Sequence, residues 1–247
     1  MRDLRLLAFP ALEIAAFAHF AAHRPGSLAA LAAAAVFACF TLHVAVHERV
    51  HRAPRSGATL LHGAATLLAG LPFHGYLWHH VNHHRHVNSL EDFSTTWRST
   101  PAGPVARGLF SYAFGWPLWL VRSQRVFHAE IARREVPVAV VRGIRWQQAL
   151  LVLFVIALAI VSPRAALGYL AMVYVAWVLI AAQNYGQHPP REFGTGLTTS
   201  YPAPFYNAIT ANNGLHHEHH RDPSRAALDL RPDPSAPRVA RPHLLAP

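Results

Sequence analysis

The sequence predicts an all-α integral membrane protein with about four transmembrane helices in two hairpins, interfacial helices and a cytoplasmic histidine-rich cap. Three observations predict this class. First, 52% of the 247 residues are hydrophobic and only 14% are charged, whereas about 25% is usual in soluble domains. Second, several apolar stretches approach the roughly 20 residues that cross a bilayer as a helix. Third, many of the 19 histidines stand next to these stretches.

The first hairpin is predicted from two apolar runs. Residues 6–22 include one glutamate and are the weaker candidate for a span, whereas residues 28–46 carry no formal charge. Between them, residues 23–27 contain a Pro-Gly pair, which is typical of a turn. We expect the second helix to continue past the membrane to His51. The proline within residues 52–57 is expected to end it there.

The middle of the chain is predicted to lie at the membrane surface. Residues 58–78 are apolar but contain glycine, proline and histidine, which favours a bent or re-entrant helix over a straight span. Residues 109–121 are too few to cross, and their tryptophans are typical of an interfacial helix. Residues 122–145 are basic and helix-like.

The second hairpin is predicted from the apolar runs 146–162 and 165–182, which a Ser-Pro-Arg turn at 162–164 joins. The sequence after this hairpin is polar and rich in proline and arginine. We expect one membrane domain over residues 1–230 and a disordered C-terminal tail over residues 231–247.

The arginines predict the orientation. All 22 basic residues are arginine, the two short turns hold one each, and the segment from 48 to 145 holds twelve. Because basic residues favour the cytoplasmic side, both termini and this long segment are expected there. We expect an integral protein of the bacterial inner (plasma) membrane. No nucleic-acid partner is expected, since the charge follows the membrane pattern and no DNA- or RNA-binding motif is present.

Nine histidines stand at the spacing of metal ligands, in four short clusters. Imidazole is the commonest side-chain ligand of metals and suits iron, zinc and copper. Nine ligands are too many for one ion and fit two. The clusters are HERVH at 47–51, HVNHH at 80–84, NYGQH at 184–188 and HHEHH at 216–220, with the candidate ligands His47, His51, His80, His83, His84, His188, His216, His219 and His220.

The spacing within the clusters predicts on which side of a helix each histidine ring lies. His47 and His51 are four residues apart on a helix, so both rings lie on one face. In the H-x-x-H-H unit, we expect His80 and His83 to share a face and His84 to point about 100° away from His83. One helix with this unit reaches two ions, and the unit is repeated at 216–220.

The remaining histidines lack ligand spacing or lie elsewhere. His19 and His23 fall at the far end of the first span, and loss of His243 from the tail is expected to be silent. The other members without ligand spacing are His62, His74 and His128, and those whose role stays open are His43, His79, His86 and His217.

Four carboxylates are candidates for holding the ring N–H groups of the ligands: Glu48, Glu91, Asp92 and Glu218. Two of them, Glu48 and Glu218, lie inside the histidine clusters and are the candidate catalytic residues. The one cysteine, Cys39, stands in an apolar run, which excludes an intramolecular disulfide and a multi-thiolate zinc site.

The four clusters together resemble the membrane fatty acid desaturase and hydroxylase superfamily, the histidine-box non-haem di-iron enzymes. The resemblance covers about residues 28–225, and HERVH and NYGQH also look like the alkane hydroxylase branch. It implies two iron ions held by the nine histidines, dioxygen as co-substrate and a lipid or acyl-chain substrate. We expect no fused haem or ferredoxin domain, so the resemblance implies an external electron donor such as ferredoxin or rubredoxin with its reductase.

The leading interpretation is desaturation of a fatty acyl or similar lipid chain. A hydroxylase or ketolase of an alkane, acyl chain or carotenoid would share the ligands and the oxidant, and the sequence does not separate the two. A membrane zinc peptidase would use H-E-x-x-H with Glu48 as its base, but it needs one further ligand rather than seven histidines. A metal transporter or sensor would need polar residues along an intramembrane path, and the predicted spans hold few.

Overall fold

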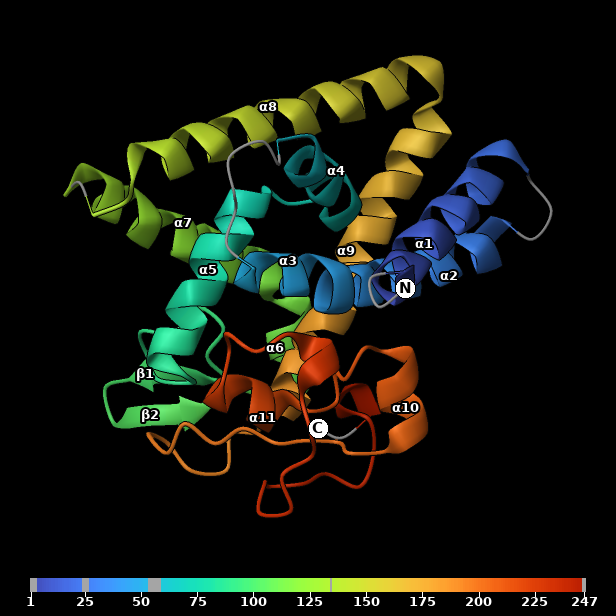
Figure 1. Cartoon of the computed structure of the whole chain (residues 1–247). Coiled ribbons are helices and arrows are strands. Elements are labelled where there is room, and N and C mark those ends of the chain that lie inside the picture. Colours follow the sequence, from blue (N-terminus) through green and yellow to red (C-terminus); the bar gives the residue numbers. More distant parts are fainter. Residues whose placement is uncertain (1–3, 24–26, 53–58, 134, 246–247) are drawn as a thin grey trace. The chain divides into compact units, whose positions relative to one another are not determined.

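The computed structural model describes residues 4–23, 27–52, 59–133 and 135–245 (Figure 1). The chain forms two compact units, each built from two separate stretches. The helical unit comprises Met1–Leu77 and Arg134–Trp177, and the histidine unit comprises Trp78–Arg133 and Val178–Pro247. The single domain expected over residues 1–230 stays a prediction.

The helical unit consists of long apolar helices. Small residues allow α2 to approach its neighbours closely, since buried Ala34 and Ala35 pack with Tyr169 and Met172 of α9. In Figure 1, α1 and α2 lie side by side. The elements of this unit are α1 (Leu4–Ala22), α2 (Ser27–Phe40), the π-helical stretch η1 (Thr41–Val46), α3 (His47–His51), α4 (Thr59–Ala69), the start of α5 (Phe73–His86), α8 (Val138–Val161) and most of α9 (Pro163–Gln187).

Three helices of the described chain are long and apolar enough to cross a membrane: Ser27–His51, Val138–Val161 and Pro163–Gln187. The first confirms that the helix over 28–46 continues to His51. The apolar part of α1, Leu6–Ala22, is shorter. At 1.5 Å per residue it is about 25 Å long, less than the roughly 30 Å of a bilayer core. The described residues therefore support three spans rather than four, and the orientation stays a prediction.

The bend expected within 58–78 is confirmed. Helices α4 and α5 are separate, and Gly70 between them adopts φ 65°. A Cβ atom at Gly70 would lie 2.5 Å from Cγ1 of Val173, so both the backbone conformation and the space require glycine. The Thr66 hydroxyl accepts the Phe73 N–H at 3.1 Å and so caps α5. The sequence predicts that the helix ends within residues 52–57. Residues 53–57 lie outside the described residues.

The histidine unit holds shorter elements. Its hairpin pairs β1 (Trp97–Thr100) with β2 (Gly103–Ala106) in antiparallel register, Trp97 opposite Ala106. The prediction of an all-α chain is therefore wrong for this hairpin, although the protein is mostly helical. The other elements are the end of α5, α6 (Leu109–Phe114), α7 (Trp116–Ala132), the end of α9, α10 (Pro204–Ile209), α11 (His216–Arg221), η2 (Ala227–Asp229) and η3 (His243–Leu245).

The C-terminal segment packs within the histidine unit. Ser200 donates its N–H to the Pro237 carbonyl at 2.8 Å and accepts the Val239 N–H at 3.0 Å. Ala236 and His243 are buried. The predicted disorder of 231–247 is therefore wrong for the described part up to residue 245. Its composition resembles a disordered tail, but backbone pairing with the segment around Ser200 holds it in place.

Candidate metal centre

One group of four imidazoles comes from three elements of the histidine unit. Their ligand nitrogens all lie within 4.8 Å of one another. Nε2 of His216 lies 2.8 Å from Nε2 of His188, and both residues are buried. We call this set the four-histidine group; it consists of His83 on α5, His188 directly after α9, and His216 and His220 on α11.

A second set, the three-histidine group, lies beside the first in the same unit and consists of His80, His84 and His219. Nε2 of His84 lies 3.0 Å from Nε2 of His80 and 3.0 Å from Nε2 of His219. The ring centroids of His84 and His220 are 4.3 Å apart. Each H-x-x-H-H unit therefore contributes to both groups, and the histidine unit brings together seven of the nine predicted ligands.

The pairing on α5 differs from the prediction that His80 and His83 share a face. His80 is grouped with His84, and His83 belongs to the other group. The reason is helical geometry. A residue four positions on lies about 40° around the helix, whereas a residue three positions on lies about 60° away in the other direction. The four-residue spacing therefore aligns two ligands better.

The two groups fit metal ions. Two imidazole nitrogens bound to one ion at right angles, each about 2.1 Å from it, would be about 3 Å apart. The Nε2 pairs of this unit are separated by 2.8–3.0 Å. Among the described residues, Nε2 of His83 and both ring nitrogens of His220 are buried without a hydrogen-bond partner. Such atoms are costly to bury unless something binds them, and a metal ion would do so.

Three of the predicted ligands are held in the neutral form, which is the form that binds metal. Burial lowers the pKa of His188, His216 and His220 well below the ordinary value, and the neighbouring imidazoles lower it further. Because a ligating imidazole must lose its proton, the protein has already met this requirement at neutral pH.

The other two predicted ligands lie together in the helical unit. His47 and His51 are one turn apart on α3, with ring centroids 4.8 Å apart. Between them, buried Glu48 forms an ion pair with Arg52 at 2.6 Å. The π-helical stretch directly before α3 contains the buried His43. Single turns of π-helix often occur next to functional sites.

Comparison with known families decides the identity. The family model described as "Fatty acid desaturase" matches residues 8–232, which is most of the chain. This chain belongs to the fatty acid desaturase family. Membership implies an oxidoreductase that associates with membranes and acts on a lipid. Neither a curated protein nor a solved structure gave a match.

In this desaturase-family chain, the segment before His188 is tied to the rest of the histidine unit. Asn184 donates to the Ser94 carbonyl at 3.2 Å and to the Tyr112 hydroxyl at 2.6 Å. The next residue, Tyr185, donates its hydroxyl to the Arg107 carbonyl at 2.8 Å. The polar residues of NYGQH therefore fix the last turn of α9, from which His188 follows.

Gly186 lets the C-terminal segment approach the same turn. A Cβ atom at this position would lie 2.2 Å from the carbonyl oxygen of His243. His243 is fully buried, and its Nε2 lies 3.0 Å from the Thr199 carbonyl oxygen. His243 therefore lies in the interior beside the four-histidine group, with its ring centroid 6.3 Å from that of His216. That its loss is silent stays a prediction.

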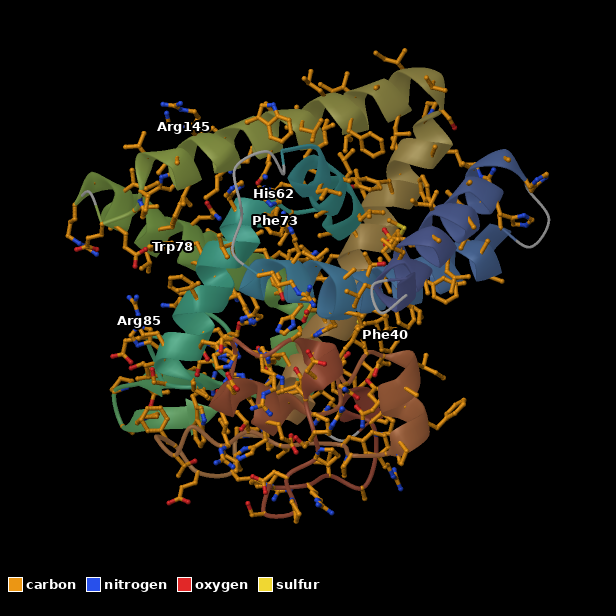
Figure 2. The ribbon with its side chains drawn as sticks, viewed as in Figure 1. Phe40, His62, Phe73, Trp78, Arg85 and Arg145 are labelled. Atoms are coloured by element: carbon orange, nitrogen blue, oxygen red, sulfur yellow. The ribbon has the colours of Figure 1, made fainter. Side chains whose placement is uncertain are left out.

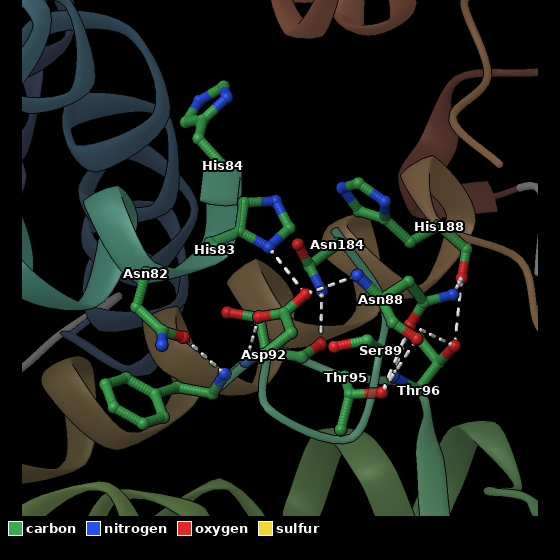
Figure 3. A network of polar contacts seen from close by, with 12 residues as sticks. Asn82, His83, His84, Asn88, Ser89, Asp92, Thr95, Thr96, Asn184 and His188 are labelled. Atoms are coloured by element: carbon green, nitrogen blue, oxygen red, sulfur yellow. Dashed lines mark hydrogen bonds and ion pairs between the residues drawn. The ribbon is translucent and has the colours of Figure 1, made fainter. Parts of the chain in front are cut away.

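The loop after α5 carries the carboxylate that contacts a ligand. Asp92 is buried, and its Oδ2 lies 2.9 Å from Nδ1 of His83 (Figure 3). Burial alone would raise the pKa of Asp92, but His83 and hydrogen bonds from His83 and the Asn88 backbone outweigh it and lower the pKa to about 2. Asp92 is therefore in direct hydrogen-bond contact with a predicted ligand.

Two other candidates of the histidine unit have different contacts. Glu218 accepts hydrogen bonds from the Ser200 hydroxyl and from the Asp233 N–H, the latter at 2.8 Å, and so connects α11 to the C-terminal segment. Glu91 accepts a hydrogen bond from the Ser89 hydroxyl at the surface.

Several histidines without an assigned role have structural contacts. In the helical unit, His62 stacks on Phe73 with ring centroids 4.2 Å apart; Figure 2 labels both residues. His74 lies 2.8 Å from the Gln147 amide nitrogen. In the histidine unit, His79 contacts the Ser94 hydroxyl, and His217 contacts the Thr198 hydroxyl. His128 on α7 is exposed.

Proposed function

We propose that this protein is a membrane di-iron oxidoreductase that uses dioxygen and external electrons to desaturate a fatty acyl or similar lipid chain. Family membership supports an oxidoreductase acting on a lipid. The observation that carries the di-iron proposal is the pair of adjacent histidine groups in one unit. A single-zinc peptidase would need only one of them.

The ligands divide into two sets in this proposal. One iron is assigned to the four-histidine group. The other is assigned to the three-histidine group together with His47 and His51. The assignment of these last two rests on the box pattern HERVH and on their shared helical face. An all-imidazole set without thiolate suits iron.

Bound iron would supply the oxidising power of the reaction with dioxygen. The residues of the chain do the remaining work. The imidazoles of the two groups would hold the ions, and Asp92 orients His83 by accepting its Nδ1–H. A hydrocarbon chain would enter from the bilayer between the apolar spans. The buried histidines His80, His83, His188, His216 and His219 would limit the access of bulk water. The catalytic roles of Glu48 and Glu218 stay part of the proposal.

Electrons would come from a separate ferredoxin-like or rubredoxin-like protein with its reductase. Basic residues on the long segment between the hairpins support a cytoplasmic face for the active site and an inner-membrane location. Exposed Arg125 and Arg133, in and directly after α7, are candidates for steering an acidic donor.

Metal analysis and product analysis together test the proposal. The purified protein is expected to hold about two irons per chain. Expressed with a suitable reductase system, it is expected to form a lipid product two mass units lighter than the substrate. A product sixteen mass units heavier would assign hydroxylation instead. Full occupancy by a single zinc, without iron-dependent activity, would refute the di-iron proposal.

A further inference from the structure

The loop between α5 and β1 holds one ligand ring directly. Asp92 accepts the Asn88 N–H and the Ser94 N–H, each at 2.7 Å, in addition to its contact with His83. A carboxylate only accepts hydrogen bonds, so the proton of the His83 ring must lie on Nδ1. The lone pair is then on Nε2, which is the buried ring atom without a hydrogen-bond partner. Asp92 therefore fixes both the tautomer and the orientation of His83.

The same loop holds the backbone of a second ligand. Asn88 and Thr96 both donate to the carbonyl oxygen of His188, at 3.4 Å from the Asn88 amide and 3.1 Å from the Thr96 hydroxyl (Figure 3). Asn88 Oδ1 accepts the Thr96 N–H at 2.8 Å. The Asn88 backbone adopts φ 60°, a conformation that asparagine tolerates better than most residues.

We propose that the loop Asn88–Thr96 is a positioning device that holds His83 and His188 together as ligands of one ion. These two histidines come from segments about a hundred residues apart, and the loop is hydrogen-bonded to both. This inference rests on the proposed function, since it takes the four-histidine group as an iron site. Asp92, Asn88 and Thr96 are positioning residues because they act on the ion only through its ligands.

The proposal predicts that the two iron sites respond differently. The hydrogen bonds of the loop reach His83 and His188, which both belong to the four-histidine group. In the three-histidine group, the Nε2 atoms of His80 and His219 both face His84. Damage to the loop should therefore weaken one iron and spare the other.

The experiment compares iron retention in Asp92→Asn with that in the wild-type protein. Asparagine keeps the shape of the side chain but loses the charge that holds the His83 ring. The matched control is Glu91→Gln, which changes the neighbouring exposed carboxylate. Iron per chain and the rate of iron release to a chelator are measured on the purified full-length protein, together with its thermal unfolding and the spectroscopic signature of the irons.

Asp92→Asn is expected to release one of the two irons at least about tenfold faster than wild type, while the second iron behaves normally. Glu91→Gln should match wild type. Thr96→Val should show the same selective loss more weakly, and Thr96→Ser, which restores the hydroxyl, should reverse it. If Asp92→Asn does not fold, the threonine pair decides the question.

Two irons held by Asp92→Asn and Thr96→Val with wild-type release rates would overturn the inference. Equal weakening of both irons in folded protein would also overturn it. A wild-type protein that binds no iron would instead refute the proposed function, so the two failures are distinguishable.

Discussion

In the helical unit, buried Ala34 and Ala35 form an apolar cluster with Tyr169 and Met172. In the histidine unit, the buried positions include Asp92, Thr96 and His188. Apolar contacts are non-directional and depend mainly on area and volume. Buried polar groups each require a partner of the right kind at the right distance. Such an apolar contact should therefore tolerate many conservative substitutions. In the histidine unit, loss of a single hydrogen-bonding atom should already lower stability or metal binding.

The largest expected effect follows from removing a predicted ligand of the histidine unit. His80→Ala or His219→Ala should lower turnover on the order of 100-fold or more, since loss even of a ligand's hydrogen-bond partner costs about 10–100-fold in metal affinity or activity. Turnover and iron content are measured with His128→Ala, an exposed histidine of the same unit, as the control. Near-normal activity of His80→Ala with full iron would show that the ligand assignment is wrong.

Two glycines on α9 test whether close packing is stricter in the histidine unit. A Cβ atom at Gly186 would lie 2.2 Å from the His243 carbonyl oxygen, whereas one at Gly168 would lie 2.0 Å from Cε1 of the Phe20 ring. A ring can shift more easily than a backbone. Gly186→Ala should therefore cost about 3 kcal/mol of unfolding free energy and Gly168→Ala about 1 kcal/mol.

Thermal or denaturant unfolding in detergent measures both glycine variants. Limited proteolysis locates the damage, because Gly186→Ala should expose the C-terminal segment and Gly168→Ala should not. Equal stability losses, or a larger loss for Gly168→Ala, would contradict the comparison between the units.

The helical unit was largely predictable because its signals are local in the sequence. The apolar runs 146–162 and 165–182 locate most of α8 and α9 without knowledge of any partner, although α8 already begins at Val138. The glycine and proline around residue 70 mark the break before α5. The clustering of the predicted ligand histidines was also predictable, since their spacing repeats the period of a helix. Their role as metal ligands stays a prediction. The grouping of His80 with His84 follows from helical geometry, because residues four apart are separated by a smaller angle around the helix than residues three apart.

The residues that support the ligands were not predictable in the same way. The hydrogen bond from Thr96 to the His188 carbonyl joins residues 92 positions apart, and Thr96 alone looks like any loop residue. Asp92 is among the carboxylates predicted to hold a ligand ring, but the sequence does not distinguish it from the neighbouring Glu91, which is exposed. The proline and arginine content of the C-terminal segment predicts disorder, because composition does not reveal the backbone bridge between Arg238 and Ser200.

For His243, the sequence and the structure predict different effects of substitution on stability. The sequence predicts that its loss is silent, whereas the structure buries the ring and pairs Nε2 with the Thr199 carbonyl. His243→Ala should cost about 2 kcal/mol of unfolding free energy, since it leaves a cavity and an unsatisfied carbonyl. Leu245→Ala, at an exposed neighbouring position, is the control. Unfolding curves identical to wild type for both variants would support the sequence-based expectation instead.

The smallest expected effect concerns association with the external electron donor rather than the interior of either unit. Arg125 and Arg133 are exposed in the histidine unit, and anionic lipid headgroups offer one explanation for such arginines. If they steer an acidic donor, Arg125→Glu with Arg133→Glu should lower turnover at limiting donor roughly threefold in low salt. The loss should shrink as ionic strength rises, because screening shortens the reach of the charges to about 10 Å at 0.1 M salt.

A saturating concentration of the electron donor should restore the rate of the Arg125→Glu, Arg133→Glu variant, since the metal ligands are untouched. A rate that responds to neither salt nor charge reversal, with membrane integration intact, would leave lipid binding as the role of these arginines.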